Sequence, residues 1–226
     1  MQMSKREKKS SSRIAILASG SGTNAENIIR HFNLGDGCSG AAASKIATVE
    51  LVVSNKADAY VLTRAKNLNV PAVVMNKAQL CGTQENGYTP TEFIELLRQY
   101  RIDVVVLAGY LLQVPKAVID IYRDRIINIH PALLPAYGGK GMYGERVHKA
   151  VLSDMQSYME QHPNEPKDFY SGITIHLVDE QMDHGRILFQ ASFLLSPNET
   201  LESLEDKIHT QEQASYPIIL AAWLRE

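Results

Sequence analysis

Several features are scarce in this sequence, and each scarcity excludes a class of protein. Only two cysteines occur among the 226 residues, Cys38 and Cys81, and neither belongs to a metal-binding or C-x-x-C spacing. Lys and Arg form no basic block beyond Lys5–Lys9, and the formal charge of −2 gives no reason to expect a nucleic acid partner. No apolar run approaches the ~18 residues that a membrane span needs. These absences predict a soluble protein of a reducing compartment, the cytoplasm, and they leave its oligomeric state open.

The chain does contain enough apolar sequence for one sizeable core, because 45% of its residues are hydrophobic. Met1–Ser12 is charged and rich in serine, and it lacks the apolar segment of a signal peptide. We therefore expect a disordered N-terminal tail over residues 1–12 and a single domain over residues 13–226.

Short apolar runs alternate with segments of helical periodicity along the whole domain. The predicted strands are 13–19, 48–53, 70–75, 103–109, 126–130, 171–179 and 187–195. The predicted helices are 25–31, 57–67, 93–100 capped by Thr89 or Thr91, a short one after Pro115, 145–160, and 201–224 with Pro217 as a possible break. The segments 38–47 and 81–90 are predicted loops. This alternation predicts an α/β fold, with an open, mostly parallel sheet and helices on both faces, as in Rossmann-like domains.

Ligands in such folds bind beyond the carboxyl ends of the strands, near the point where the strand order reverses. Four features of the sequence are expected at that edge: the loop at Gly20, the loop at Gly109, the strand end at Asn128 and His130, and the acidic turn at Asp183. The sequence thus predicts that these four features converge on one cleft.

Asn128 and His130 lie two residues apart at the end of an apolar strand, so their side chains project from the same face. An amide can donate a hydrogen bond to a developing oxyanion, and an imidazole can move a proton near neutral pH. An isolated Asn-x-His is more often a pair that holds a loop in place, and taken alone Asp183 fits a turn-capping residue. The remaining motifs decide between these interpretations.

The turn Gly20-Ser21-Gly22-Thr23-Asn24 joins the first predicted strand to the first predicted helix. Its glycines are free to take positive φ, and its backbone N–H groups lie at a helix N-terminus, where phosphate can bind. Glycine-rich first turns also occur where a helix simply packs closely on a sheet. The turn therefore supports a phosphate site without proving one.

A set of motifs from about Arg13 to Trp223 carries a resemblance to a known family. The motifs are Ala18-Ser19-Gly20-Ser21-Gly22-Thr23-Asn24, Val53-Ser54-Asn55-Lys56-Ala57-Asp58-Ala59, Val104 to Gly109, Asn128-Ile129-His130-Pro131-Ala132-Leu133-Leu134-Pro135, Thr174-Ile175-His176 and Gln211-Glu212. In this order they resemble the folate-dependent phosphoribosylglycinamide formyltransferases of purine biosynthesis.

The resemblance implies transfer of the formyl group of 10-formyltetrahydrofolate, the co-substrate, to the amine of glycinamide ribonucleotide without a metal. By the same resemblance the catalytic residues are Asn128, His130 and Asp183. The residues implied to bind the ribonucleotide and its phosphate are Gly20, Ser21, Gly22, Thr23, Asn24, His209 and Glu212. Those implied to line the folate site are Tyr110, Leu111, Leu112, Gln113, Val114, Asp179, Glu180, Gln181 and Met182.

The sequence also departs from the family pattern in places. His184 stands where a small residue is commoner, and the segments 138–144 and 156–168 are expanded. Two further histidines, His148 and His176, are more often satisfied structural residues, and we expect both to be so here.

Three alternatives stay open at this point. A related enzyme acting on methionyl-tRNA or water would usually carry an extra domain, for which this chain is short. A dinucleotide-binding protein would use the loose G-x-G-x-x-A pattern at Gly20 to Ala25, but Ser54-Asn55-Lys56 supplies no acid for a ribose hydroxyl. A catalytically dead binding protein is disfavoured by the intact set of Asn128, His130 and Asp183.

Overall fold

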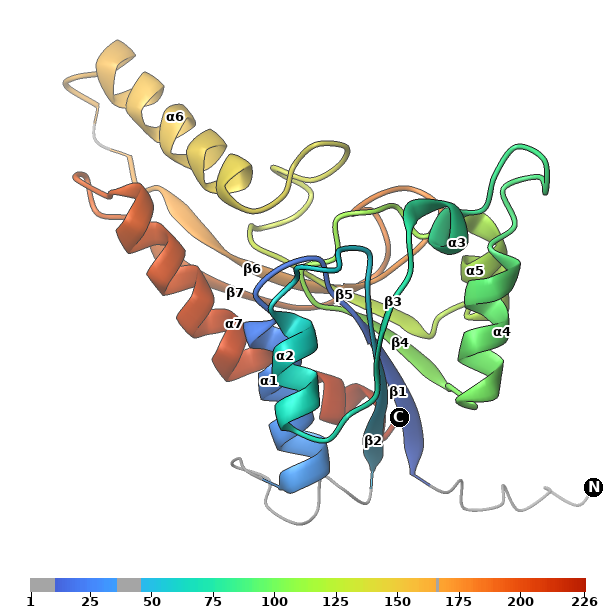
Figure 1. Cartoon of the computed structure of the whole chain (residues 1–226). Helices are drawn as coiled ribbons and strands as arrows, with labels where there is room; N and C mark the ends of the chain where they lie inside the picture. The colour runs from blue at the N-terminus through green and yellow to red at the C-terminus, as the bar shows by residue number, and fades with distance from the viewer. Residues whose placement is uncertain (1–10, 36–45, 166) are drawn as a thin grey trace, which may run out of the picture.

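The computed structural model of the protein describes residues 11–35, 46–165 and 167–226. Within these residues a seven-stranded sheet lies at the centre of the fold (Figure 1). The strand order is β3-β2-β1-β4-β5-β6-β7. The strands are β1 (Ser12–Leu17), β2 (Ala47–Ser54), β3 (Ala72–Val74), β4 (Val104–Leu107), β5 (Ile126–His130), β6 (Tyr170–Leu177) and β7 (Ile187–Leu194). Neighbouring strands from β3 to β5 pair in parallel, whereas β6 and β7 are antiparallel to their neighbours. The sheet is therefore open and mostly parallel, as predicted.

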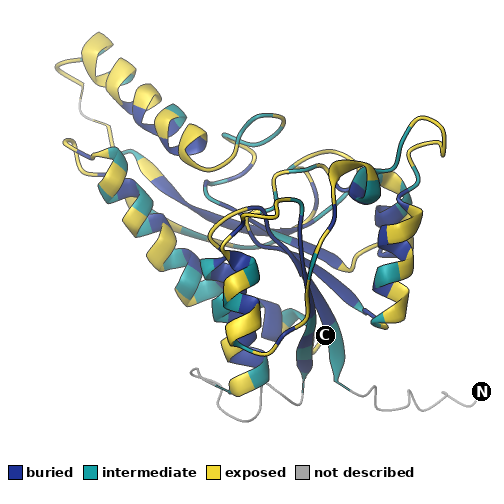
Figure 2. Ribbon diagram, viewed as in Figure 1, coloured by how far each residue is buried: buried dark blue, intermediate teal, exposed yellow. Residues whose placement is uncertain are grey.

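Helices cover both faces of this sheet (Figure 1). The chain forms α1 (Thr23–Ile29), the π-helical η1 (Arg30–Leu34), α2 (Val61–Asn67), α3 (Lys77–Cys81), α4 (Thr91–Gln99), α5 (Lys116–Ile121), α6 (Glu145–Gln161) and α7 (Leu201–Trp223). One apolar core lies between the sheet and α1, α2, α6 and α7, and a second lies between the sheet and α3, α4 and α5. Figure 2 shows the central strands buried between helices whose outer faces are exposed. The central strands are apolar on both sides because both of their faces are covered.

The strand order reverses between β1 and β4, which lie side by side although two strands separate them in the sequence. The chain therefore leaves β1 toward one side of the sheet and leaves β4 toward the other. The turn after β1 and the loop after β4 diverge at this point and leave a crevice between them. Ser19 N, at the end of β1, donates a hydrogen bond to the carbonyl of Gly109, which follows β4 (3.0 Å).

The last helix, α7, continues through Pro217 without a break. A proline in a helix has no N–H to donate to the carbonyl four residues earlier, which is that of Gln213. Here the side chain of Asn27 in α1 donates to this carbonyl instead (2.7 Å). The expected interruption is absent because a neighbouring helix satisfies the group that the proline leaves free.

Several boundaries differ from the predictions. The helix predicted from residue 57 begins at Val61, after a turn. Neither Thr89 nor Thr91 caps α4, whose N-cap is Pro90 without a side-chain hydrogen bond. The short helix α3 was not predicted, and its capping box is formed by Asn76 and Gln79.

Two predicted irregular segments lie mainly outside the described residues. These are the N-terminal tail, of which only Ser11 and Ser12 are described, and the loop at 38–47, of which only Ile46 and Ala47 are described. Among the described helices, none is both long and apolar enough to cross a membrane.

Candidate active site

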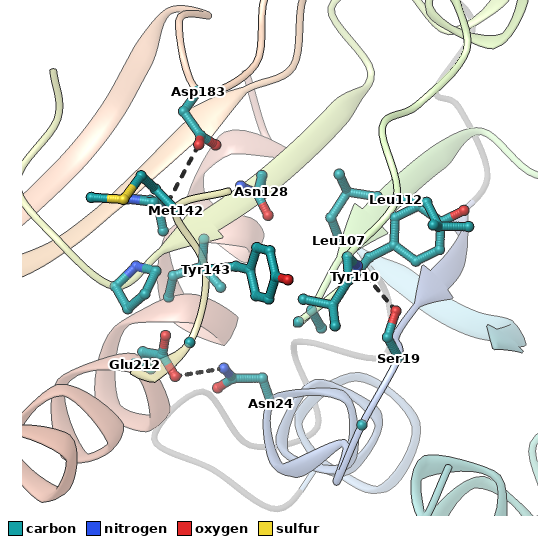
Figure 3. Close-up of a pocket in the computed structure, with 18 of the residues that line it drawn as sticks. Ser19, Asn24, Leu107, Tyr110, Leu112, Asn128, Met142, Tyr143, Asp183 and Glu212 are labelled. Carbon is teal, nitrogen blue, oxygen red and sulfur yellow. Dashed lines mark hydrogen bonds and ion pairs between the residues drawn. The ribbon is translucent and has the colours of Figure 1, made fainter. Parts of the chain in front are cut away.

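A cavity of about 530 Å³ opens at the carboxyl ends of β1, β4 and β5, where the strand order reverses. Figure 3 shows Asp183 and Asn128 on one side of it, the pair Asn24 and Glu212 on the opposite side, and Tyr110 and Leu112 on a third. All four features that the sequence placed at this edge contribute to the wall. The volume lies in the range of pockets that bind small molecules.

Asn128 lies on β5 directly opposite His176 on the antiparallel strand β6. Nδ1 of His176 lies 2.8 Å from the Leu177 carbonyl, to which it donates, so Nε2 accepts a hydrogen bond from the Asn128 amide (3.1 Å). The Asn128 amide is held in place by this bond and keeps a second proton for a ligand. His176 thus orients an amide that lines the cavity.

His130 is almost fully buried at the end of β5. Its Nε2 donates to the carbonyl of Tyr137 (2.8 Å), and its Nδ1 lies 3.7 Å from a carboxylate oxygen of Asp183. Burial lowers the pKa of His130 below its usual value, against the opposing influence of Asp183 and the Tyr137 carbonyl. In the free protein near neutral pH the imidazole is therefore mainly uncharged, with a carboxylate facing its second nitrogen.

Asp183 belongs to the turn between β6 and β7 and takes a left-handed conformation, with φ of 56°. Its carboxylate accepts the backbone N–H of Gly139 (2.9 Å) and lies 3.7 Å from both His130 and His176. Burial alone would raise the pKa of this carboxyl, but the nearby His176 imidazole, the hydrogen bond from Gly139 and the nearby His130 outweigh it and lower the pKa. Asp183 is therefore an anion that faces two imidazoles.

The opposite side of the cavity joins the turn after β1 to α7. Thr23 Oγ1 lies 2.9 Å from His209 Nε2, and the Asn24 amide donates to the buried carboxylate of Glu212 (2.8 Å). Burial raises the pKa of Glu212, although Asn24 and His209 oppose the rise. These contacts bring the predicted phosphate turn and the predicted α7 residues to the same wall.

The two glycines of this turn differ in what surrounds them. Gly22 has a φ of 75°, and a Cβ there would lie 2.4 Å from a methyl group of Val61 in α2. A Cβ on Gly20 would meet no atom within 4 Å. Gly22 is therefore required by the backbone and by packing, whereas Gly20 leaves open space toward a ligand.

The loop after β4 forms the apolar wall of the cavity. All five predicted residues of this loop line it, namely Tyr110, Leu111, Leu112, Gln113 and Val114. The N–H of Leu111 donates to the hydroxyl of Ser19 (3.0 Å), which ties the loop to the end of β1. Burial raises the pKa of the Tyr110 phenol far above its usual value, so this residue contributes a neutral ring.

The predicted folate turn divides between two surfaces. Asp179 and Met182 line the cavity, whereas Glu180 and Gln181 lie on a separate shallow depression next to α5. The Glu180 carboxylate pairs with Lys116 of α5. His184 is exposed, 3.4 Å from Asp179, and also lies outside the cavity.

Sequence reasoning missed several residues that line the cavity. His148 and His176, both expected to be structural, lie in its wall, as do Met142 and Tyr143 of the glycine-rich segment 138–144. Figure 3 shows the Tyr143 ring between the Asn128 side and the Tyr110 side. The pairing of His176 with Asn128 across two neighbouring strands is the signal that could have assigned His176 to the cavity. This pairing depends on an antiparallel register that strand periodicity does not reveal.

An open α/β sheet with an amide, an imidazole and a carboxylate gathered in one cavity at its strand ends is an arrangement suited to acyl transfer. Amide and imidazole groups are suited to an oxyanion and to a proton in transit. Within the described ranges, no three His, Cys, Asp or Glu side chains are grouped so as to hold a metal ion.

The chain belongs to the formyl transferase family, whose model matches residues 12–220. It is 38% identical over 214 residues to the chloroplastic phosphoribosylglycinamide formyltransferase of Arabidopsis thaliana, covering 95% of this chain and 66% of that protein. It is 34% identical over 215 residues to the phosphoribosylglycinamide formyltransferase of Haemophilus influenzae, covering 95% and 87%. The crystal structure of phosphoribosylglycinamide formyltransferase from Bacillus halodurans superposes with a TM-score of 0.72 at 33% identity, covering 95% and 96%.

Proposed function

We propose that this chain transfers the formyl group of 10-formyltetrahydrofolate to the amine of glycinamide ribonucleotide in purine biosynthesis. The observation that carries the proposal is the meeting of Asn128, His130 and Asp183 in a cavity that also reaches the Gly20–Asn24 turn. The names of the relatives in plants and bacteria support the same reaction.

The acceptor amine attacks the formyl carbon, and negative charge develops on the formyl oxygen. The Asn128 amide, held by His176, donates its remaining proton to that oxygen. The hydrogen bond between Asn128 and His176 is already present in the free protein, so the amide does not have to reorient as the charge develops. Asn128 therefore acts chiefly by stabilising the transition state.

His130, with Asp183 beside it, accepts the proton that the attacking amine releases and passes it on. The free enzyme holds His130 neutral, with its unprotonated Nδ1 facing the Asp183 carboxylate across 3.7 Å. A proton taken up at Nδ1 lies between the ring and an anion, and the resulting imidazolium stands beside the oxyanion. The proton then passes to the folate nitrogen as the bond from that nitrogen to the formyl carbon breaks.

Each substrate has a wall whose chemistry suits it. The open backbone at Gly20, with Thr23 and His209 beside it, suits the phosphate of the ribonucleotide. The apolar loop of Leu111, Leu112 and Val114, with Met182 facing the same cavity, suits the flat ring system of the folate. The two substrates then meet at Asn128 and His130. We assign the reaction to the cytoplasm, as composition predicts.

The test follows the loss of the formyl group from 10-formyltetrahydrofolate by absorbance, with purified chain, in the presence and absence of glycinamide ribonucleotide. We expect turnover only when the ribonucleotide is present, and much slower turnover with its dephosphorylated form. Turnover without an acceptor would make the chain a hydrolase. No turnover combined with tight NAD binding would favour the dinucleotide-binding alternative.

A further inference from the structure

Four histidines line the cavity, and three of them have hydrogen-bond partners. His130 bonds to the Tyr137 carbonyl, His176 to Asn128 and the Leu177 carbonyl, and His209 to Thr23. The fourth, His148, has no partner for either ring nitrogen among the described residues. Buried polar atoms are nearly always paired, so an unpaired imidazole in a cavity wall calls for an explanation.

His148 projects from the first turns of α6 and is only 6% exposed. Its Nδ1 is fully enclosed, so the small exposed part of the residue that lines the cavity lies elsewhere on the side chain. Burial, and then the nearby His130 and His209, lower its pKa, while Glu145 one turn earlier opposes them. A neutral ring of this kind offers one N–H donor and one acceptor nitrogen.

The two imidazoles that influence His148 mark the two ends of the acceptor path. His130 stands at the site of formyl transfer, and His209 stands beside the turn proposed to bind phosphate. His148 lines the same cavity as both of them and belongs to α6, which packs against α7, the helix that carries His209. The part of an acceptor that spans these ends is the sugar with its amide-linked glycyl group, which carries hydroxyl and carbonyl groups but no charge. A neutral hydrogen-bonding group matches that chemistry better than a cation would.

We propose that His148 is a binding residue for the ribose and glycinamide portion of the acceptor, to which it hydrogen-bonds through Nε2. The proposal rests on the proposed function and adds a residue that fixes the acceptor between its phosphate and its amine. The ligand supplies Nε2 with a hydrogen-bond partner that the described part of the protein lacks, while the enclosed Nδ1 is left as the unprotonated nitrogen of the neutral ring.

The test compares His148→Phe, His148→Gln and the wild-type chain by calorimetry with glycinamide ribonucleotide and, separately, with tetrahydrofolate. Phenylalanine keeps a flat ring and removes both nitrogens, whereas the glutamine amide can place an N–H near the position of Nε2. We expect His148→Phe to weaken ribonucleotide binding about five- to tenfold, the equivalent of a lost hydrogen bond, and His148→Gln to restore part of the loss. Folate affinity should stay within about twofold of the wild type.

A matched control is His162→Phe, the same substitution at the C-cap of the same helix but outside the cavity, where the ring stacks on Tyr158. This variant should bind the ribonucleotide as the wild type does. The melting temperature of His148→Phe should not fall, because the substitution removes an unpaired buried nitrogen.

Three outcomes would overturn the assignment. Unchanged ribonucleotide affinity in His148→Phe excludes His148 from the acceptor site, and an equal loss for both ligands makes its role one of cavity shape. A wild-type chain that binds no glycinamide ribonucleotide contradicts the proposed function itself, and the inference falls with it.

Discussion

The two ends of the cavity are built differently. At the acceptor end, α1 and α7 pack directly on each other, and their side chains interlock through the bonds of Thr23 to His209 and of Asn24 to Glu212 and Gln213. At the transfer end, where Asn128, His130 and Asp183 lie, the glycine-rich segment 138–144 is held to Asp183 by a single backbone hydrogen bond, from Gly139.

Under the proposed function, this difference in structure places acceptor binding at one end of the cavity and formyl transfer at the other. The packed helices hold the residues of the acceptor end in fixed positions, which under that proposal favours affinity and orientation. A segment attached to Asp183 by one hydrogen bond can adjust when the charge at that site changes. Changes at the acceptor end should therefore act mainly on acceptor binding, and changes at the transfer end mainly on the rate and its pH dependence.

The largest effect is expected for His130→Ala, at the transfer end. Loss of a positioned acid or base typically slows a reaction by about 10²- to 10⁴-fold. Ribonucleotide affinity should be nearly unchanged, because Thr23, Asn24 and Glu212 are untouched. Single-turnover kinetics and calorimetry on the folded variant measure the two effects, and turnover like that of the wild type would remove His130 from the mechanism.

Asp183→Asn should have the next largest effect, a loss of rate on the order of 10- to 100-fold. The amide oxygen can still accept the N–H of Gly139, so the shape of the site is kept while the negative charge is lost. That charge raises the pKa of His130, so its removal lowers this pKa further, and the acid limb of the pH–rate profile should move to lower pH. An acid limb that does not move would assign it to the acceptor amine instead.

Gly20→Ala tests the acceptor end without disturbing the fold. The added methyl group has open space, so the melting temperature should stay close to that of the wild type while ribonucleotide affinity falls on the order of tenfold. Gly22→Ala is the contrasting variant, since its Cβ clashes with Val61 and should cost about 1–3 kcal/mol of stability. Equal losses of folate and ribonucleotide affinity in Gly20→Ala would contradict a phosphate role for the turn.

The smallest effect is expected for Glu212→Gln, and it is a change in the thermal stability of the folded protein. Because burial raises the pKa of Glu212 in the folded protein, its stabilising contribution is lost as pH rises through the unfolded and then the folded pKa. The amide can still accept from Asn24, so the variant should melt at a higher temperature than the wild type at neutral pH, by about 2–4 °C for each kcal/mol gained. Ribonucleotide binding should weaken. Thermal melts at pH 4 and 7 check the sign, because the gain should shrink at the lower pH.

The parallel half of the fold was predictable because its central strands are apolar runs that are largely buried on both faces. The position of Asn128 and His130 in the cavity wall was predictable because both lie at the end of such a run, β5. The helix at Lys77–Cys81 was not found, since its capping box lies in a short polar stretch without helical periodicity. The start of α4 was misassigned to a threonine because a Pro90 N-cap leaves no side-chain signal.

The rest of the site depends on contacts between distant segments. His176 meets Asn128 through an antiparallel register, and His148 reaches the cavity because the first turn of α6 forms part of its wall. Glu180, next to Asp179 in the sequence, faces away from the cavity because Lys116 holds it against α5. Local pattern gives the type of each residue, but the direction in which it points is decided by packing.

Pro217 sets the register between the two helices of the acceptor end. Helices repeat every turn, so one helix can in principle shift along another by about 5.4 Å and find similar contacts. Pro217 makes one position along α7 different from the others, because it leaves the Gln213 carbonyl without a helical donor. The Asn27 side chain donates its hydrogen bond to that carbonyl. With Asn27 fixed there, Asn24 one turn earlier meets Glu212, and Thr23 meets His209. The alignment of the acceptor site therefore follows from one hydrogen bond that a proline cannot make.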